Sequence, residues 1–293
     1  MVLTGTPHPW TAPDGAAFTY TEWRPAPPAR AVIVAVHGLS GAAIDFELLG
    51  AQLIPHGLAT LALELRGQGS DPLLRRRGDL RKLADWFDDL RAFIALVHTL
   101  HPGAPLFFYG ESMGAALLTR YLSEAPITAQ PAGLILASPV VVLPRRPARW
   151  QEFLFRALLF GWPTLRINVR RLTKPRRNAP PAYVTRDEAH RKWFETAPHR
   201  LDTYTIRFFR SLLDLVGGSL DAAPRLRVPA LVLAAGHDVF ITADRVKSFF
   251  DRLGSADKQF ALFPESYHLL LHDHEKAEVL ARIEAWLLAR LSR

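Results

Sequence analysis

Short apolar runs alternate with amphipathic helical patterns along most of the chain. The segment from Leu80 to Leu100 carries apolar residues at the spacing of one helical face, and Met113–Leu122 and Glu275–Leu291 are also helical in pattern. Between these segments lie apolar runs that favour buried strands. The expected strands are Ala31–Val36, Leu58–Leu65, Leu106–Tyr109, Leu134–Ala137, Ala230–Ala235 and Gln259–Phe263. Strands that alternate with helices predict an α/β domain with a mostly parallel central sheet flanked by helices.

The alternation stops between Pro139 and about Gly218. There the chain is basic, aromatic and helical in pattern, and we expect no strand in it. Because Pro229 then introduces a further strand, the strands of one sheet lie on both sides of this segment, which predicts one domain with a helical insertion. The predicted core is residues 1–138 and 219–293, and the predicted insertion is residues 139–218.

The composition fits a globular protein without cysteine chemistry. The chain has 293 residues, of which 49% are hydrophobic, so it is long enough to bury the core of one large domain. It contains no cysteine, which excludes disulfides, cysteine nucleophiles and cysteine-ligated metals. The N-terminal residues show no signal-peptide pattern, and the aromatic run Phe153–Trp162 is too short to span a bilayer. We therefore expect a soluble cytoplasmic protein, with peripheral contact to a membrane as the alternative location.

Positive charge is concentrated in the predicted insertion. The net charge of the chain is +8, and the segment from Val140 to Pro180 holds many basic residues but one acid, Glu152. The basic residues are Arg145, Arg146, Arg149, Arg156, Arg166, Arg170, Arg171, Lys174, Arg176 and Arg177. The simpler interpretation is an arginine-rich surface exposed to water. Because aromatic residues lie among the arginines, contact with an anionic membrane is the alternative, whereas no motif supports nucleic-acid binding.

A Gly-x-Ser-x-Gly motif, Gly110–Gly114, joins a predicted strand to a predicted helix. A serine at such a turn has a strained backbone, and the small residues on both sides let the turn close. The turn presents the Ser112 hydroxyl above the carboxyl ends of the parallel strands and places the Met113 N–H at a helix N-terminus. Ser112 is therefore the candidate nucleophile, and the Met113 N–H is a candidate donor to an oxyanion.

A serine nucleophile needs a base. His268 follows the last predicted strand and is the candidate base, whereas His272 and His274 lie further on, at positions expected on a surface helix. A metal site on His268 and His272 would lack a third ligand nearby. We therefore expect a mechanism that uses neither a metal nor a cofactor.

The base in turn needs an acid to orient it. Asp238 directly follows the strand Ala230–Ala235 and is the candidate acid, whereas Asp244 falls in the next helix and is the weaker choice. A second oxyanion donor is expected from the loop after the first strand, where Gly38 lets the backbone approach and Leu39 supplies the N–H. The chain order serine, acid, histidine is one of those known for catalytic triads.

These motifs together resemble the α/β-hydrolase superfamily, and within it the monoacylglycerol lipase and lysophospholipase L2 branch, also described as serine aminopeptidase-like hydrolases. The residues that carry the resemblance are His37-Gly38, Glu64–Ser70, Gly110–Gly114, Gly236–Asp238 and Tyr267-His268. The middle motif of the family usually has histidine at the position of Gln68 and often aspartate near Glu64. Those two positions are expected to shape a turn rather than to perform chemistry.

The resemblance implies a carboxylic ester hydrolase that acts on monoacylglycerols or lysophospholipids. It also implies a cap, or lid, in residues 139–218, whose candidate substrate-binding residues are Trp150, Phe153 and Phe160. The same catalytic residues support a short-chain carboxylesterase, an aminopeptidase, a C–C hydrolase or an acyltransferase. A protein of a different class, which binds lipid surfaces without catalysis, is expected to have lost part of the triad.

Overall fold

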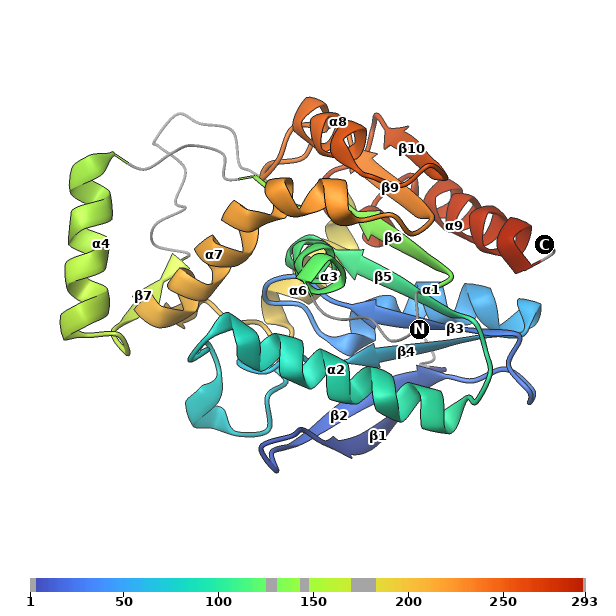
Figure 1. Cartoon of the computed structure of the whole chain (residues 1–293), viewed down its shortest axis with the longest axis horizontal. Coiled ribbons are helices and arrows are strands. Elements are labelled where there is room, and N and C mark those ends of the chain that lie inside the picture. Colours follow the sequence, from blue (N-terminus) through green and yellow to red (C-terminus); the bar gives the residue numbers. More distant parts are fainter. Residues whose placement is uncertain (1–3, 125–130, 143–147, 170–182, 292–293) are drawn as a thin grey trace.

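A mostly parallel sheet forms the centre of the computed structural model, which describes residues 4–124, 131–142, 148–169 and 183–291 (Figure 1). The sheet has eight strands in the order β1-β2-β4-β3-β5-β6-β9-β10. They are β1 (Thr6–Thr11), β2 (Ala17–Trp23), β3 (Ala31–Val36), β4 (Leu58–Leu63), β5 (Leu106–Glu111), β6 (Gly133–Ala137), β9 (Ala230–Ala235) and β10 (Lys258–Phe263). The six strands from β3 onward run parallel. The expected α/β architecture is confirmed.

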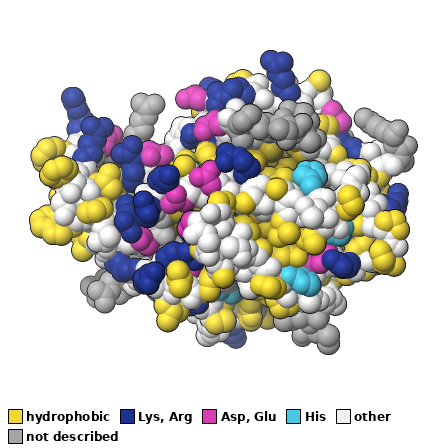
Figure 2. Space-filling view, turned by 60° about the horizontal axis from the view of Figure 1, so that its bottom comes forward, with side chains coloured by type: hydrophobic (Ala, Val, Ile, Leu, Met, Phe, Trp, Pro, Cys, Tyr) yellow, Lys and Arg dark blue, Asp and Glu magenta, His cyan; other side chains and the backbone are white. Residues whose placement is uncertain are grey.

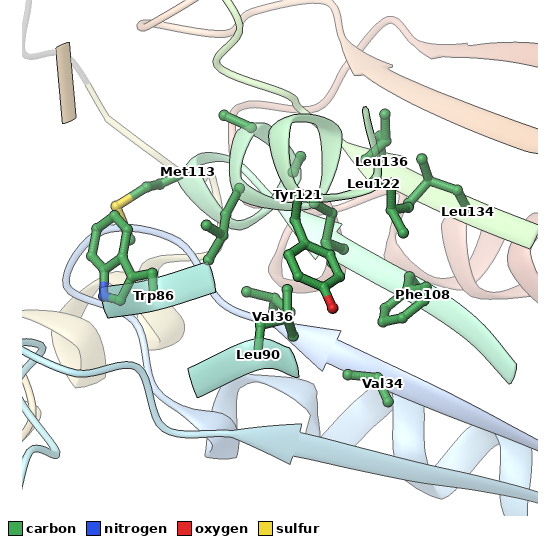
Figure 3. Close-up of a cluster of buried hydrophobic side chains, with 14 of the residues drawn as sticks. Val34, Val36, Trp86, Leu90, Phe108, Met113, Tyr121, Leu122, Leu134 and Leu136 are labelled. Atoms are coloured by element: carbon green, nitrogen blue, oxygen red, sulfur yellow. The ribbon is translucent and has the colours of Figure 1, made fainter. Parts of the chain in front are cut away.

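Helices cover both faces of the sheet because its central strands are apolar on both sides. Side chains alternate along β3, so that Val34 and Val36 contribute to one buried layer and Ile33 and Ala35 to the other. The first layer includes side chains of α2 (Leu83–Leu100), α3 (Met113–Glu124) and α8 (Ala243–Arg252), and the second those of α1 (Glu47–Leu53) and α9 (Lys276–Leu291). Figure 3 shows Leu90 of α2 beside Val36, and Trp86 of α2 beside Met113, in the first layer.

The N-terminal hairpin β1–β2 was not expected from the sequence. Its strands pair antiparallel, and β2 continues the pairing onto β4. Pro7 and Pro9 obscure the strand pattern in β1, yet both are tolerated because β1 is an edge strand whose missing N–H groups leave no ladder bond unmade. Trp10 and Phe18 stack across the hairpin with ring centroids 5.8 Å apart, and this packing extends the core over α2.

Between β6 and β9 the chain leaves the sheet and forms mainly helices. They are α4 (Arg149–Gly161), α6 (Glu188–Thr196) and α7 (Ile206–Ala222). In Figure 1, α4 stands at the left edge of the molecule, and α7 lies between it and the sheet. Among the described residues, no helix is long and apolar enough to cross a bilayer.

One expectation for this segment is wrong. It contains two short antiparallel strands, β7 (Arg166–Asn168) and β8 (Thr203–Thr205), although no strand was expected. Three residues are too few to leave a periodic pattern, so only the tertiary pairing reveals these strands. The expected boundary at residues 218 and 219 falls inside α7, which continues without interruption to Ala222.

Candidate active site

The turn between β5 and α3 holds Ser112 in a left-handed conformation with φ of 54°. A side chain at Gly110 or Gly114 would prevent this turn. A Cβ atom at Gly110 would lie 2.7 Å from Cα of Ala115, and one at Gly114 would lie 2.1 Å from the carbonyl oxygen of Val36. The two glycines therefore let the helix start directly beside the sheet. The left-handed backbone at Ser112 points its side chain away from both the strand and the helix.

Three side chains from separate loops form one hydrogen-bonded chain. His268 Nε2 lies 2.8 Å from Oγ of Ser112, and His268 Nδ1 lies 2.7 Å from Oδ2 of Asp238. With the Nδ1–H donating to the carboxylate, Nε2 is left to accept from the serine hydroxyl. An alcohol bonded to an oriented imidazole in this way can be deprotonated as it attacks an electrophile.

The surroundings fix the acid and the base. The second carboxylate oxygen of Asp238 accepts hydrogen bonds from the N–H groups of Phe240 and Ile241, at 2.8 and 3.2 Å. The imidazole of His268 is 3% exposed, and the Phe240 ring meets it edge-on at 4.7 Å. Asp244, the weaker alternative acid, lies in the first turn of α8 and is exposed.

The loop after β3 brings its backbone close to the serine. A Cβ atom at Gly38 would lie 3.1 Å from Cβ of Ser112, a tight contact that glycine avoids. The Gly38 carbonyl accepts from Nδ1 of His37 at 2.9 Å and from the Gly41 N–H at 3.2 Å. Because C=O and N–H of a trans peptide point in opposite directions, these bonds orient the Leu39 N–H away from the core. The Met113 N–H, the other candidate donor, begins α3 directly after Ser112.

His37 keeps this orientation because it is neutral. Its Nε2 accepts from the Leu65 N–H at 3.1 Å, which leaves the proton on Nδ1 for the Gly38 carbonyl. Complete burial lowers the pKa of His37 to about 4. Glu64 lies 3.6 Å from the same Nε2, but burial raises the pKa of Glu64 to about 8, so the two do not form an ion pair at neutral pH.

Buried carboxyl groups lie beneath the serine and were not anticipated as part of the site. Burial, and to a smaller extent the negative charge of Asp45, raise the pKa of Glu111 to about 8. Burial also raises the pKa of Asp45 to about 7. Among the described residues, Oε2 of Glu111 and Oδ1 of Asp45 have no hydrogen-bond partner. Glu111, which directly precedes Ser112, is therefore mostly protonated at pH 7 and does not place a full negative charge beside a developing oxyanion.

Glu111→Gln should change how stability depends on pH. In the wild type the unfolded chain ionises Glu111 above about pH 4.5, while the folded chain keeps it protonated to about pH 8. The wild type should lose stability relative to the variant as pH rises through this window, by up to about 1.4 kcal/mol per pH unit. Denaturant unfolding at pH 5 and pH 8 measures the difference. The exposed Glu278→Gln serves as control, and a Glu111→Gln profile parallel to that control would contradict the assignment.

His272 is not a surface residue, as the sequence pattern had indicated. It lies in the short 3-10 helix Leu270–His272 and is 8% exposed. Its Nε2–H donates to the Asp45 carbonyl at 2.8 Å, and its ring stacks on His190 of α6 at 3.9 Å. Burial lowers the pKa of His272 to about 3. Within the described residues, no three histidine, aspartate or glutamate side chains are arranged to hold a metal ion.

The aromatic residues proposed for substrate binding are exposed to solvent. Trp150, Phe153 and Phe160 are 66%, 74% and 95% exposed on α4, and no residue of α4 is buried. In the described part of the chain they do not line an enclosed acyl pocket. Several predicted basic residues lie outside the described residues: Arg145, Arg146, Arg170, Arg171, Lys174, Arg176 and Arg177.

Two residues hold Ser40, in the loop after β3, and the sequence did not indicate this role for either of them. Gln68, expected only to shape a turn, accepts a hydrogen bond from the Ser40 N–H through Oε1 at 3.0 Å. Tyr204, in the middle of β8, lies 2.6 Å from the Ser40 hydroxyl. No local signal marks Tyr204, because its partner lies 164 residues earlier in the chain.

Comparison with known proteins gives one family over most of the chain. Residues 27–275 match the Hydrolase_4 family, described as serine aminopeptidase, S33. The chain is 24% identical to monoacylglycerol lipase of Mycolicibacterium smegmatis over 98% of this chain and 99% of the relative. It is 23% identical to phospholipase YtpA of Bacillus subtilis over 87% of this chain and 94% of the relative.

A solved structure supports the same architecture. A soluble variant of monoglyceride lipase from Saccharomyces cerevisiae, in complex with a substrate analogue, superposes with a TM-score of 0.82 and 20% identity. The superposition covers 99% of this chain and 97% of that one. At this identity the likeness concerns the fold.

Proposed function

Because the chain belongs to the serine aminopeptidase S33 family of α/β-hydrolases, we propose that it hydrolyses carboxylic esters of single-chain lipids through an acyl-enzyme. Its relatives mark it as a carboxylic ester hydrolase of the monoacylglycerol lipase-like branch. The observation that carries the mechanism is the hydrogen-bonded chain from Ser112 through His268 to Asp238.

In the first half of the reaction, Ser112 Oγ attacks the ester carbonyl while its proton moves to Nε2 of His268. Asp238 stabilises the imidazolium through Nδ1–H, and the N–H groups of Leu39 and Met113 donate to the oxyanion. The tetrahedral intermediate then collapses. The bond to the leaving alkoxide breaks as His268 returns the proton, which releases the alcohol and leaves the acyl group on Ser112.

In the second half, water replaces the alcohol. His268 takes a proton from water as the hydroxide adds to the acyl carbonyl, and then gives that proton to Oγ of Ser112 as the ester bond breaks. The products are a fatty acid and the regenerated enzyme. Every proton in this cycle is carried by His268, so the mechanism requires no other titrating group.

Single-chain lipids are proposed as substrates because one relative is named a monoacylglycerol lipase, and a second relative, named a phospholipase, supports a lipid ester more broadly. The test is a panel of monoacylglycerols, lysophospholipids and p-nitrophenyl esters of several acyl lengths. We expect turnover to rise with acyl length and to favour one headgroup. Turnover restricted to short esters would replace the lipid substrate with a general esterase activity, and cleavage of amino-acid p-nitroanilides would indicate an aminopeptidase.

A fluorophosphonate probe separates catalysis from simple lipid binding. The probe forms a covalent bond with an activated serine, so peptide mapping should find it on Ser112 of the folded protein. A folded protein that binds lipid vesicles and remains unlabelled would be a non-catalytic lipid-binding relative.

We also propose that α4 contacts anionic membrane surfaces. Its exposed aromatic side chains, Phe153 and Phe160 among them, lie on the same helix as the exposed Arg149 and Arg156. Figure 2 shows hydrophobic and basic side chains side by side at the left end of the molecule, the end that carries α4. Such a surface inserts rings into the headgroup region and attracts anionic lipid.

Activity on vesicles should therefore depend on lipid charge. At low salt, monoacylglycerol in phosphatidylglycerol vesicles should be hydrolysed several-fold faster than in phosphatidylcholine vesicles, and added salt should remove the difference by screening. Phe153→Ala combined with Phe160→Ala should lower the rate on vesicles but not on a soluble ester. The control is Leu262→Ala, which changes an exposed residue on β10. Equal rates on both vesicles at every salt concentration would contradict the proposal.

A further inference from the structure

Ser40 adopts a backbone conformation that its side chain disfavours. Its φ is 61°, in the left-handed region that glycine occupies most readily. The residue lies directly after Leu39, in the loop that follows β3 and brings Gly38 close to Ser112. A non-glycine residue in this conformation persists when surrounding contacts hold it there. The contacts of Ser40 therefore identify what its side chain does.

Three hydrogen bonds hold Ser40. Its N–H donates to Oε1 of Gln68 at 3.0 Å, and its hydroxyl lies 2.9 Å from the Leu201 carbonyl and 2.6 Å from the Tyr204 hydroxyl. A serine hydroxyl has one proton, and a carbonyl oxygen can only accept. Ser40 therefore donates to Leu201, and Tyr204 donates to Ser40. The N–H and the hydroxyl of Ser40 are therefore both hydrogen-bonded, and these bonds hold the loop in place.

The two side chains that hold Ser40 are completely buried. Gln68 and Tyr204 are both 0% exposed. Burial raises the pKa of Tyr204 well above its usual value, so its hydroxyl remains a donor throughout the neutral range. Among the described residues, Nε2 of Gln68 has no hydrogen-bond partner. An orphaned buried donor is costly, so the amide is present for its oxygen, which accepts from Ser40.

The partners come from two different parts of the fold. Gln68 belongs to the turn after β4, whereas Leu201 and Tyr204 belong to the segment between β6 and β9. That segment is pressed against the turn, because a Cβ atom at Gly69 would lie 1.4 Å from the carbonyl oxygen of His199. The ring of Tyr204 is fixed in turn by Phe208, at 4.6 Å between ring centroids. The loop that contains Ser40 is therefore held from two sides, by Gln68 and by the segment that contains Tyr204.

We propose that Tyr204 and Gln68 are positioning residues, which hold Ser40 and thereby the Leu39 N–H at the place where the oxyanion develops. The proposal rests on the proposed function, because it concerns the same reaction. It makes β8 part of the catalytic support, so that the segment after β6 acts on the chemical step. Because the oxyanion develops only during the reaction, loss of this support should destabilise the transition state more than it weakens substrate binding.

The test removes single hydroxyl groups. Tyr204→Phe keeps the ring and loses only the donor to Ser40, so kcat should fall about tenfold while KM stays within about twofold. The affinity for a trifluoromethyl ketone, which mimics the tetrahedral intermediate, should fall in parallel with kcat/KM. Tyr121→Phe is the matched control, because Tyr121 is a buried tyrosine of α3 away from this loop, and it should retain wild-type values.

A second variant covers the case in which Tyr204→Phe fails to fold. Ser40→Gly suits the left-handed backbone but lacks the hydroxyl, so it should fold well and still lose kcat. Combined with Tyr204→Phe, it should cost less than the sum of the two separate losses, since both variants lack the bond between Tyr204 and Ser40, and Ser40→Gly loses in addition the bond to the Leu201 carbonyl. Wild-type kcat and inhibitor affinity in these variants, or a change in KM alone, would overturn the proposal. Absence of turnover dependent on Ser112 in the wild type would instead overturn the proposed function.

Discussion

Ser112→Ala should reduce kcat on every ester substrate by about 10⁶-fold. The variant keeps the loop after β3 and His268, but it has no side-chain oxygen that can form the acyl-enzyme. Any remaining hydrolysis must use water directly, with help only from the oxyanion donors. The measurement is a progress curve on p-nitrophenyl and monoacylglycerol substrates at enzyme concentrations high enough to detect the residual rate.

The control for this variant is Ser123→Ala, which removes a hydroxyl of α3 that donates to the Arg120 carbonyl. It should retain activity. Substrate binding by Ser112→Ala should persist, since the substitution removes one oxygen atom and leaves the apolar surroundings intact. If Ser112→Ala kept more than a few per cent of wild-type turnover, the nucleophile would have to be another group.

Asp238→Asn should lower kcat by about 10⁴-fold with little change in KM. The asparagine NH₂ can donate to Nδ1 of His268, which moves the imidazole proton to Nε2. Nε2 then faces Ser112 as a donor and cannot accept its proton. The N–H groups of Phe240 and Ile241 can still bond the remaining amide oxygen, so the loop should keep its shape.

Asp244→Asn separates this effect from a general loss of acidic charge near the site. Asp244 is exposed at the start of α8 and should tolerate the change with activity within about twofold of wild type. The comparison of kcat for the two variants, with thermal unfolding as a check on folding, measures the prediction. Equal losses in both variants would contradict the role of Asp238.

The central sheet could be predicted from the sequence because its strands are apolar on both faces. Runs such as Ala31–Val36 and Ala230–Ala235 are completely buried, and short, continuous apolar runs of this kind are typical of strands covered on both faces. The turn at Ser112 could be predicted for a local reason as well, since two glycines at fixed spacing are a steric requirement. The meeting of Ser112, Asp238 and His268 follows from the carboxyl ends of parallel strands lying at one edge of the sheet.

Features that depend on distant partners could not be predicted. The burial of His272 results from its bonds to residues far away in the chain, whereas the local pattern indicates a surface position. The role of Tyr204 depends on a loop at Ser40, and its own strand has only three residues. The exposure of Phe153 and Phe160 has the same origin. An aromatic run predicts burial, but only the packing of α4 decides which side chains are covered.

The insertion between β6 and β9 has a consequence for folding as the chain is made. Strand β6 pairs with β5 on one side and with β9 on the other, so that Leu134 lies beside Ala230. About a hundred residues must leave the ribosome before this second edge is covered, which gives the sheet a high contact order. Until then the nascent chain presents an apolar strand with unpaired backbone groups. That edge is a template for another chain, so the length of the insertion makes the half-made protein prone to aggregation.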